Sequence, residues 1–175
     1  GREAGGITQH IGASFLPVET IQKICGPMYE KLSKVEHKIP GILVIDTPGH
    51  EIFTNLRSRG GSAADIAILV VDANRGFQPQ TNESLKILES RKVPFVVALN
   101  KTDMISGWKD TETQFISQSI EKQNPEVQTF LDEKIYNVVT ALSVLGYQSE
   151  AFYRINDYKK EIAIVPVSAK TGIGI

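Results

Sequence analysis

Residues 100–103 read NKTD and place an amide, an amine and a carboxylate side by side. A lone carboxylate in a loop is usually solvated. At this spacing, however, Asp103 can accept two hydrogen bonds, from the N1–H and the exocyclic amino group of guanine. Adenine has an acceptor at N1 and lacks that amino group, so it would leave the carboxylate unpaired. The Lys101 stem can lie along a base face, and Asn100 can reach the base edge or fix a neighbouring loop.

A second loop, SAKTG at residues 168–172, supports the same chemistry. Alone it is a weak signal, because small residues and glycine commonly follow strands. Beside NKTD it gains a role. The backbone N–H of Ala169 can face the guanine carbonyl oxygen, while Ser168 braces the loop.

A third motif, DTPGH at residues 46–50, suits the phosphate end of a nucleotide. Asp, Pro and Gly are ordinary turn residues, and a histidine in a polar loop is usually solvated. Next to a phosphate site, though, Asp46 can hold Mg²⁺ directly or through water. Gly49 has no Cβ, so its N–H can approach a terminal phosphate closely. DxxG is common by chance, so its weight comes from the motifs that follow it.

Residues 2–13, REAGGITQHIGA, have two interpretations. They can be a frayed terminus. They can also be a switch loop in which Thr8 meets Mg²⁺ and the terminal phosphate, ordered by the triphosphate and relaxed on its loss. The residues alone leave both open.

The elements that must position these loops are short apolar runs alternating with helical patterns. The runs show weak alternation, which is typical of parallel strands covered on both faces. The expected strands are residues 42–45, 66–71, 95–99 and 162–167, and the expected helices are residues 81–91 and 132–145, the latter with Gly146 at its C-terminal cap. The pattern predicts a single α/β domain over residues 1–175, with a mostly parallel sheet and helices on both faces.

Polar residues follow all four expected strands, namely Asp46, Asp72, Asn100 and Ser168. In open α/β sheets, ligands bind beyond the carboxyl ends of the strands. We therefore expect one site assembled from four loops.

Composition and charge narrow the classes of function. The chain has 41% hydrophobic and 22% charged residues and a formal net charge of −1. This balance gives no global electrostatic reason to expect nucleic-acid binding, although a local basic patch could still bind a nucleic acid. Residues 66–71 form the longest uninterrupted apolar run, which is too short to cross a bilayer, so no membrane partner is expected.

DTPGH, NKTD and SAK, in that order on an α/β pattern, resemble the GTP-binding domain of translational GTPases. AGGITQHIGA before DTPGHE, followed by RSRG and PQT, narrows the resemblance to initiation factors two and five B. The long segment between the guanine loop and the last strand, residues 107–158, is more similar to the archaeal–eukaryotic branch.

This resemblance implies a cytoplasmic GTP hydrolase that promotes ribosomal subunit joining, with GTP or GDP as ligand and Mg²⁺ as cofactor. Its partners would be both ribosomal subunits, including the large-subunit GTPase-activating region, and initiator transfer RNA through domains not in this chain. Thr8 would be the switch I magnesium ligand, Asp46 would touch the metal through water, and Gly49 would bind the γ-phosphate. His50 would orient the attacking water on the ribosome, whereas His10 and His37 lack such support. The implied guanine-reading residues are Asn100, Lys101, Asp103, Ser168, Ala169 and Lys170.

The sequence departs from this family at one point. GxxxxGK[ST], the phosphate-binding loop, should precede switch I, and the chain contains no Gly-Lys pair. We therefore expect the first strand, the phosphate-binding loop and the final helix to lie outside this chain. Two interior strands would then carry unpaired edges, and the chain alone would bind nucleotide weakly.

Two other functions compete with this reading. The first is a non-catalytic GTPase-like module that binds the ribosome or another protein and lacks the phosphate-binding loop. The second is an elongation-type or selenocysteine-type factor, which shares DxPGH and NKxD. AGGITQHIGA weighs against the second.

Overall fold

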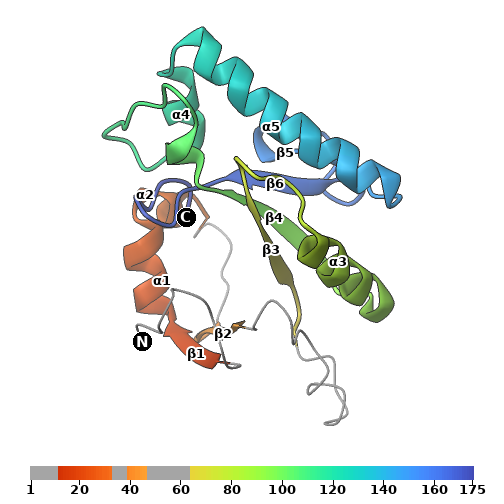
Figure 1. Cartoon of the computed structure of the whole chain (residues 1–175). Helices are drawn as coiled ribbons and strands as arrows, with labels where there is room; N and C mark the ends of the chain where they lie inside the picture. The colour runs from red at the N-terminus through yellow and green to blue at the C-terminus, as the bar shows by residue number, and fades with distance from the viewer. Residues whose placement is uncertain (1–11, 33–38, 47–63) are drawn as a thin grey trace. The chain divides into compact units, whose positions relative to one another are not determined.

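The computed structural model describes residues 12–32, 39–46 and 64–175 (Figure 1). It divides into two compact units, residues 1–61 and 62–175, and each is described by itself. The predicted site residues Thr8, Gly49 and His50 lie outside the described residues. The prediction of a single domain over residues 1–175 stays a prediction.

The first unit contains an antiparallel pair of strands, β1 (Gly12–Pro17) and β2 (Gly41–Asp46). Two short helices follow β1, namely α1 (Val18–Cys25) and α2 (Pro27–Leu32). The two strands approach closely at Gly41, where a Cβ atom would lie 2.3 Å from the Leu16 carbonyl oxygen. The register pairs Asp46, at the carboxyl end of β2, with Gly12.

The first predicted strand is confirmed in position, and among the described residues it pairs with β1. Residues 42–45 were expected in the parallel sheet, whereas β2 belongs to a separate two-stranded sheet. Its backbone groups pair with β1, a strand that the sequence analysis did not anticipate. Within the described residues, no strand joins β2 to β3.

The second unit is built on four parallel strands in the order β3-β4-β6-β5. Their bounds are Ala67–Asp72 for β3, Phe95–Asn100 for β4, Ser149–Ala151 for β5 and Ile162–Pro166 for β6. The three predicted strands of this unit are confirmed to within about a residue. β5 was missed because it is only three residues long and has no apolar run.

Two crossover helices confirm the predicted helical segments. α3 covers Pro79–Arg91 and α5 covers Pro125–Val144. Proline occupies the first turn of each, where a missing N–H costs nothing. Gly146 follows α5 with φ of 87°, a left-handed conformation suited to glycine at a helix end. Shorter helices lie between them and near the end, namely η3 (Thr102–Met104), α4 (Ile116–Glu121) and η4 (Phe152–Arg154).

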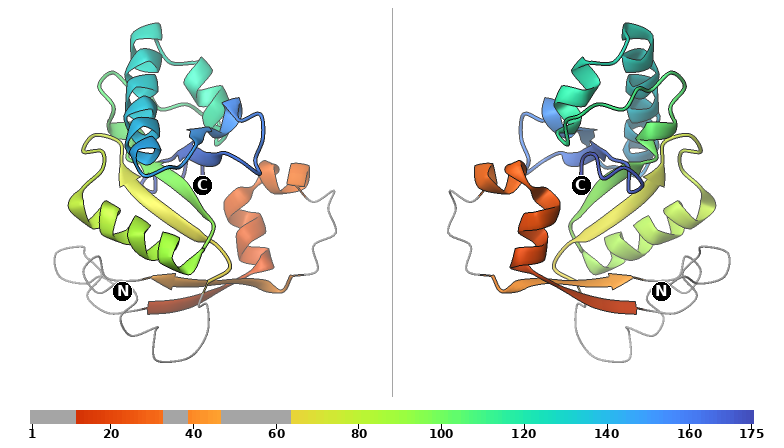
Figure 2. Two further views of the ribbon diagram at one scale, coloured as in Figure 1. Left: turned by 90° about the vertical axis from the view of Figure 1, so that its right-hand side faces the viewer. Right: turned by 90° about the vertical axis from the view of Figure 1, so that its left-hand side faces the viewer.

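One face of the four-stranded sheet carries the core of the second unit. The ladder aligns Leu69 with Val97 and Val97 with Ile164, and all three side chains are buried. Both steps from β3 to β4 and from β4 to β5 run in the same direction across the sheet. Right-handed connections therefore place α3 and α5 on the same face (Figure 2). The buried residues of these helices are Leu85, Leu88, Val127, Leu131, Ile135, Val138 and Leu142.

On the opposite face of β3, the described part of the second unit leaves two apolar side chains exposed. Ile68 and Val70 alternate with the buried Leu69 and Val71, yet they are 67% and 60% exposed. A strand with apolar residues at every position is typical of coverage on both sides.

The long segment between β4 and β6 is held by buried polar contacts. The Gln123 side chain is 4% exposed. Its Oε1 accepts the Lys109 N–H at 2.8 Å, and its Nε2 donates to the Lys109 carbonyl at 2.8 Å and to the Ser119 carbonyl at 3.1 Å. These bonds tie the loop after η3 to α4.

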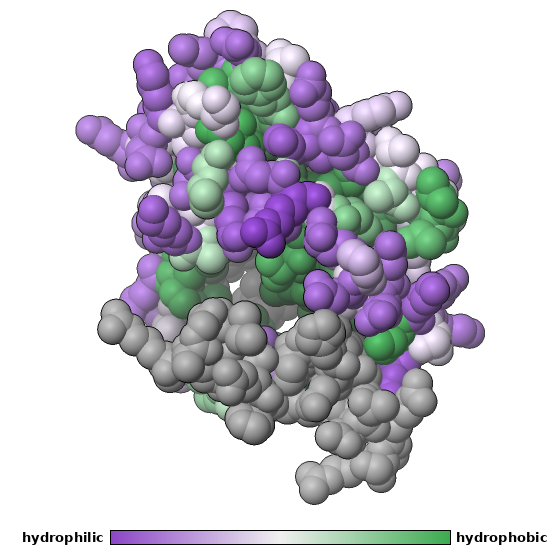
Figure 3. Space-filling view, in the orientation of Figure 1, coloured by the Kyte–Doolittle hydropathy of each residue, from purple (hydrophilic) through white to green (hydrophobic). Residues whose placement is uncertain are grey.

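In the hydropathy view, the visible surface of this unit is largely hydrophilic (Figure 3). Within the described residues, no helix has the length and hydropathy needed to cross a membrane.

The end of α3 supplies a stability prediction. Lys92 has φ of 54° and ψ of 36°, a left-handed conformation that is unfavourable for a residue with a Cβ. Its N–H donates to the Leu88 and Glu89 carbonyls, so the conformation is part of the cap. Lys92→Gly should raise the unfolding free energy by roughly 0.5 kcal/mol or more. Native-state hydrogen exchange of α3 in the full-length protein measures this change.

The matched control is Lys86→Gly, at an exposed interior position of the same helix. It should lower the unfolding free energy by about 1 kcal/mol, because glycine is a poor helix former. Equal destabilisation by both substitutions would contradict the assigned cap.

Candidate functional site

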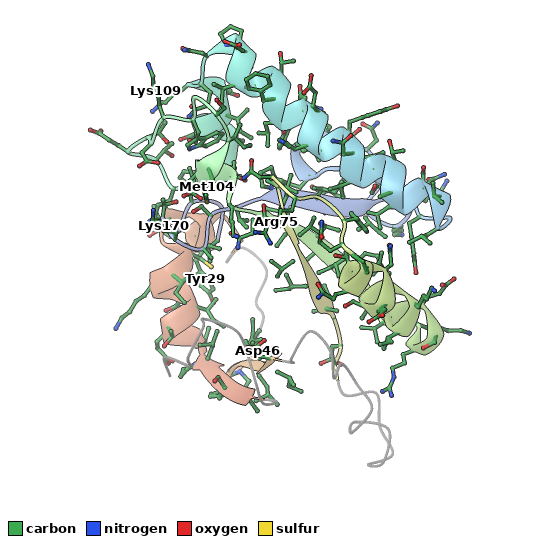
Figure 4. All side chains as sticks on the ribbon, in the orientation of Figure 1. Tyr29, Asp46, Arg75, Met104, Lys109 and Lys170 are labelled. Atoms are coloured by element: carbon green, nitrogen blue, oxygen red, sulfur yellow. The ribbon has the colours of Figure 1, made fainter. Side chains whose placement is uncertain are left out.

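The carboxyl ends of β3, β4 and β6 meet at one edge of the sheet. Asp72 and Asn100 are direct register partners, and Leu99 is paired with Pro166 just before Ser168. Arg75, Met104 and Lys170 extend from the loops at this edge (Figure 4). Three of the four predicted polar strand ends therefore come together. Asp46 ends β2 in the other unit, so its membership of this site stays a prediction.

The NKTD and SAK loops are bonded to each other. The Ala169 N–H donates to the Asn100 Oδ1 at 3.0 Å, across 69 residues of sequence. The Thr102 N–H donates to the Val167 carbonyl at 3.1 Å, and the Val167 N–H donates to the Leu99 carbonyl at 2.9 Å. Of the two functions open to Asn100 from sequence, fixing the neighbouring loop is the one seen here.

The SAK loop also closes on itself through Ser168, which is fully buried. Its N–H donates to the Ile173 carbonyl at 3.0 Å, its carbonyl accepts the Gly172 N–H at 2.8 Å, and its Oγ accepts the Thr171 N–H at 3.2 Å. Ala169 and Lys170 remain exposed at the tip. The loop therefore presents two residues on a fixed base.

The NKTD turn is anchored by its threonine. Thr102 is fully buried, and its Oγ1 donates to the Leu99 carbonyl at 3.0 Å. Lys101, just before it, has φ of 64° and ψ of 33°. A left-handed lysine is a local backbone strain that the surrounding bonds must maintain, and such strain is frequent at functional sites.

Asp103 lies in the middle of the short helix η3 and is half-buried. Within the described part of the chain, its carboxylate has no hydrogen bond or ion pair. A partly desolvated carboxylate without a partner is able to accept hydrogen bonds from a ligand. This is the chemistry that the motif predicted for Asp103.

The loop after β3, residues 72–76, joins the site as expected from its polar strand end, although its contacts with the NKTD loop were not predicted. The Asp72 Oδ1 accepts the N–H groups of Asn74 at 2.8 Å and Arg75 at 3.3 Å, while its Oδ2 lies 2.8 Å from the Lys101 Nζ. Partial burial raises the Asp72 pKa, but the hydrogen bonds from Lys101 and the two N–H groups together outweigh it, and the pKa is lowered. Asp72 is therefore ionised at neutral pH. The turn sequence DANRG directly after a strand is the sequence signal for this loop.

Among the described residues, no group of three or more histidine, cysteine, aspartate or glutamate side chains is arranged to hold a metal ion. Asp46 is exposed at the carboxyl end of β2, and the other predicted magnesium ligand, Thr8, lies outside the described residues.

Comparison with known proteins gives close relatives. The chain is 55% identical over 174 residues to a protein named "Probable translation initiation factor IF-2" from Methanopyrus kandleri, and 56% identical over 174 residues to the protein of the same name from Sulfurisphaera tokodaii. Each match covers 99% of this chain and 29% of the relative. The chain therefore spans under a third of the length of these proteins.

A solved structure agrees with this similarity. The chain matches the crystal structure of GDP-bound aIF5B from Aeropyrum pernix with a TM-score of 0.82 and 52% identity, covering 99% of this chain and 29% of that one. The match confirms the mixed α/β fold with a parallel four-stranded sheet. The family described as "Elongation factor Tu GTP binding domain" matches residues 2–175. This chain therefore belongs to the family described as the GTP-binding domain of elongation factor Tu.

Proposed function

We propose that this chain is the GTP-binding and GTP-hydrolysing part of a translation initiation factor that promotes ribosomal subunit joining. The observation that carries the proposal is the bonded pair of loops at the sheet edge, beside the Asp103 carboxylate, which has no partner among the described residues. Residues Asn100, Lys101, Asp103, Ser168, Ala169 and Lys170 form the proposed guanine site. The relatives do not favour the alternative of a non-catalytic module.

Guanine fits this site by its pattern of donors and acceptors. The Asp103 carboxylate accepts from the N1–H and the 2-amino group. The guanine carbonyl oxygen accepts a hydrogen bond from the Ala169 N–H. The same N–H also donates to the Asn100 Oδ1. Adenine reverses the polarity at both positions and leaves the carboxylate unpaired, which is a strong basis for selectivity.

The phosphate end of the nucleotide belongs to Thr8, Asp46 and Gly49 in this proposal. Hydroxyl and carboxylate oxygens are the ligands that Mg²⁺ prefers. Asp46 is exposed at the carboxyl end of β2 and supplies such a carboxylate. When bound with GTP, Mg²⁺ would neutralise phosphate charge. Gly49 would offer its N–H to the γ-phosphate.

His50 is the proposed catalytic residue. It orients a water molecule for in-line attack on the γ-phosphate when the ribosome shapes the site. The bond from the γ-phosphorus to the bridging oxygen breaks, and GDP and phosphate leave. Positioning and charge stabilisation supply the acceleration in reactions of this kind.

The proposed partners are inferred from the relatives. The chain covers 29% of the length of the Methanopyrus relative, so partners of the whole protein are part of the proposal. GDP is bound in the aIF5B structure, and GTP and GDP are the proposed ligands here. The ribosome, with its large-subunit GTPase-activating region, is the proposed activator. Initiator transfer RNA would bind through other parts of the protein, in the cytoplasm.

A change in base preference tests the guanine site. Asp103→Asn in the full-length protein replaces one acceptor by a donor, which suits the N1–H and O2 of xanthine instead of guanine. GDP affinity should fall at least ~100-fold, and xanthosine diphosphate should become the preferred ligand. Isothermal titration with both nucleotides measures this. The control is Asp110→Asn, an exposed carboxylate seven positions on, which should keep the preference for GDP. An unchanged preference in Asp103→Asn would contradict the site.

A separate prediction concerns hydrolysis. His50→Ala should lower ribosome-stimulated GTP turnover by about 100-fold or more and leave GDP affinity unchanged, because the histidine acts on water rather than on the base. Single-turnover phosphate release in the presence of ribosomes is the measurement. His37→Ala, which removes a histidine without a proposed role, should behave as wild type. Equal loss in both variants would remove His50 from the mechanism.

A further inference from the structure

We propose that Asp72 is a positioning residue for guanine recognition. It holds the Lys101 side chain across the carboxyl ends of β3 and β4, so that the methylene stem offers a fixed surface to the base. This inference rests on the proposed function and deepens it, because it adds a residue of the loop after β3 to a site otherwise built from the NKTD and SAK loops.

Several bonds join the loop after β3 to the NKTD loop. The Lys101 Nζ lies 2.8 Å from the Asp72 Oδ2. The Ala73 N–H donates to the Asn100 carbonyl at 2.9 Å, and the Asn74 Nδ2 approaches the Lys101 carbonyl at 3.5 Å. The loop after β3 therefore holds the backbone of the guanine loop as well as the tip of its lysine.

Asp72 is itself held in place by its own turn. Its Oδ1 accepts two backbone N–H groups of its own turn, from Asn74 and Arg75. The turn closes further through the Gly76 N–H, which donates to the Asp72 carbonyl at 2.8 Å. A carboxylate fixed in this way can fix its partner, which a freely rotating surface carboxylate cannot do.

The Lys101 and Asp72 side chains differ in exposure. The Lys101 side chain is 49% exposed, whereas the Asp72 side chain is 20% exposed. The ammonium group is thus held at its tip while much of the stem remains accessible to a ligand. A lysine side chain has high rotational freedom, and restraining it before binding lowers the entropic cost of association.

The pair differs from an ordinary surface ion pair in the same unit. Arg154 and Asp132 also form an ion pair, but their side chains are 45% and 49% exposed and neither belongs to the proposed site. Exposed pairs of that kind contribute little. Asp132→Asn therefore serves as a matched control that removes one paired carboxylate elsewhere.

The test is a double-mutant cycle on nucleotide affinity in the full-length protein. Asp72→Asn keeps an oxygen that can accept the Asn74 and Arg75 N–H groups, so the turn survives, but it removes the charge that holds Lys101. We expect GDP and GTP to bind about fivefold to tenfold more weakly, with the preference for guanine over adenine retained. In a Lys101→Met background, Asp72→Asn should change affinity by less than about twofold, because its effect passes through the lysine. Asp132→Asn should bind as wild type.

The outcomes separate this inference from the proposed function. If the wild-type protein shows no preference for GDP over ADP, or if Asp103→Asn leaves the preference unchanged, the proposed function fails. If both of those hold, two results overturn the role of Asp72 alone. One is unchanged affinity in Asp72→Asn, and the other is an equal loss with and without Lys101. Amide exchange at Asn74 and Arg75 checks that the turn is intact in each variant.

Discussion

The candidate site depends on the backbone hydrogen bonds that continue the β4–β6 ladder past the end of the sheet. The Leu99 carbonyl accepts the Val167 N–H, and the Val167 carbonyl accepts the Thr102 N–H. The Asn100 side chain then takes up the Ala169 N–H. Because these groups belong to two loops far apart in sequence, the bonds turn two flexible connections into one surface. The buried hydroxyl of Thr102 reinforces the same point by donating to the Leu99 carbonyl.

The sheet supports this surface from one side. Leu69, Val97 and Ile164 lie in register on the face that the core buries, and the crossover helices α3 and α5 belong to that face. Interiors are closely packed, so strands fixed in this way leave little freedom at their ends. The strained backbone of Lys101 is tolerated at such an end because its neighbours are held on both sides. The buried strands thus hold the loops in place, and the short polar loops carry the residues of the candidate site.

Much of this could be predicted from sequence, for identifiable reasons. The runs that became β3, β4 and β6 are bounded by polar residues, and NKTD and SAK stand directly after two of them. Sheet membership was harder, because the apolar run of β2 does not reveal whether its neighbour will be parallel or antiparallel. The part played by Asp72 was invisible for a similar reason, since its contact with Lys101 exists only after β3 and β4 are paired.

The central claim is that the two loops form one surface that responds to guanine as a unit. Hydrogen exchange of the Thr102 and Ala169 amides in the full-length protein, with and without GDP, tests it most directly. The account predicts that both amides exchange slowly at similar rates, that GDP slows both further, and that ADP slows neither. Exchange of the two amides at unrelated rates, or an effect of GDP on one and not the other, would contradict it.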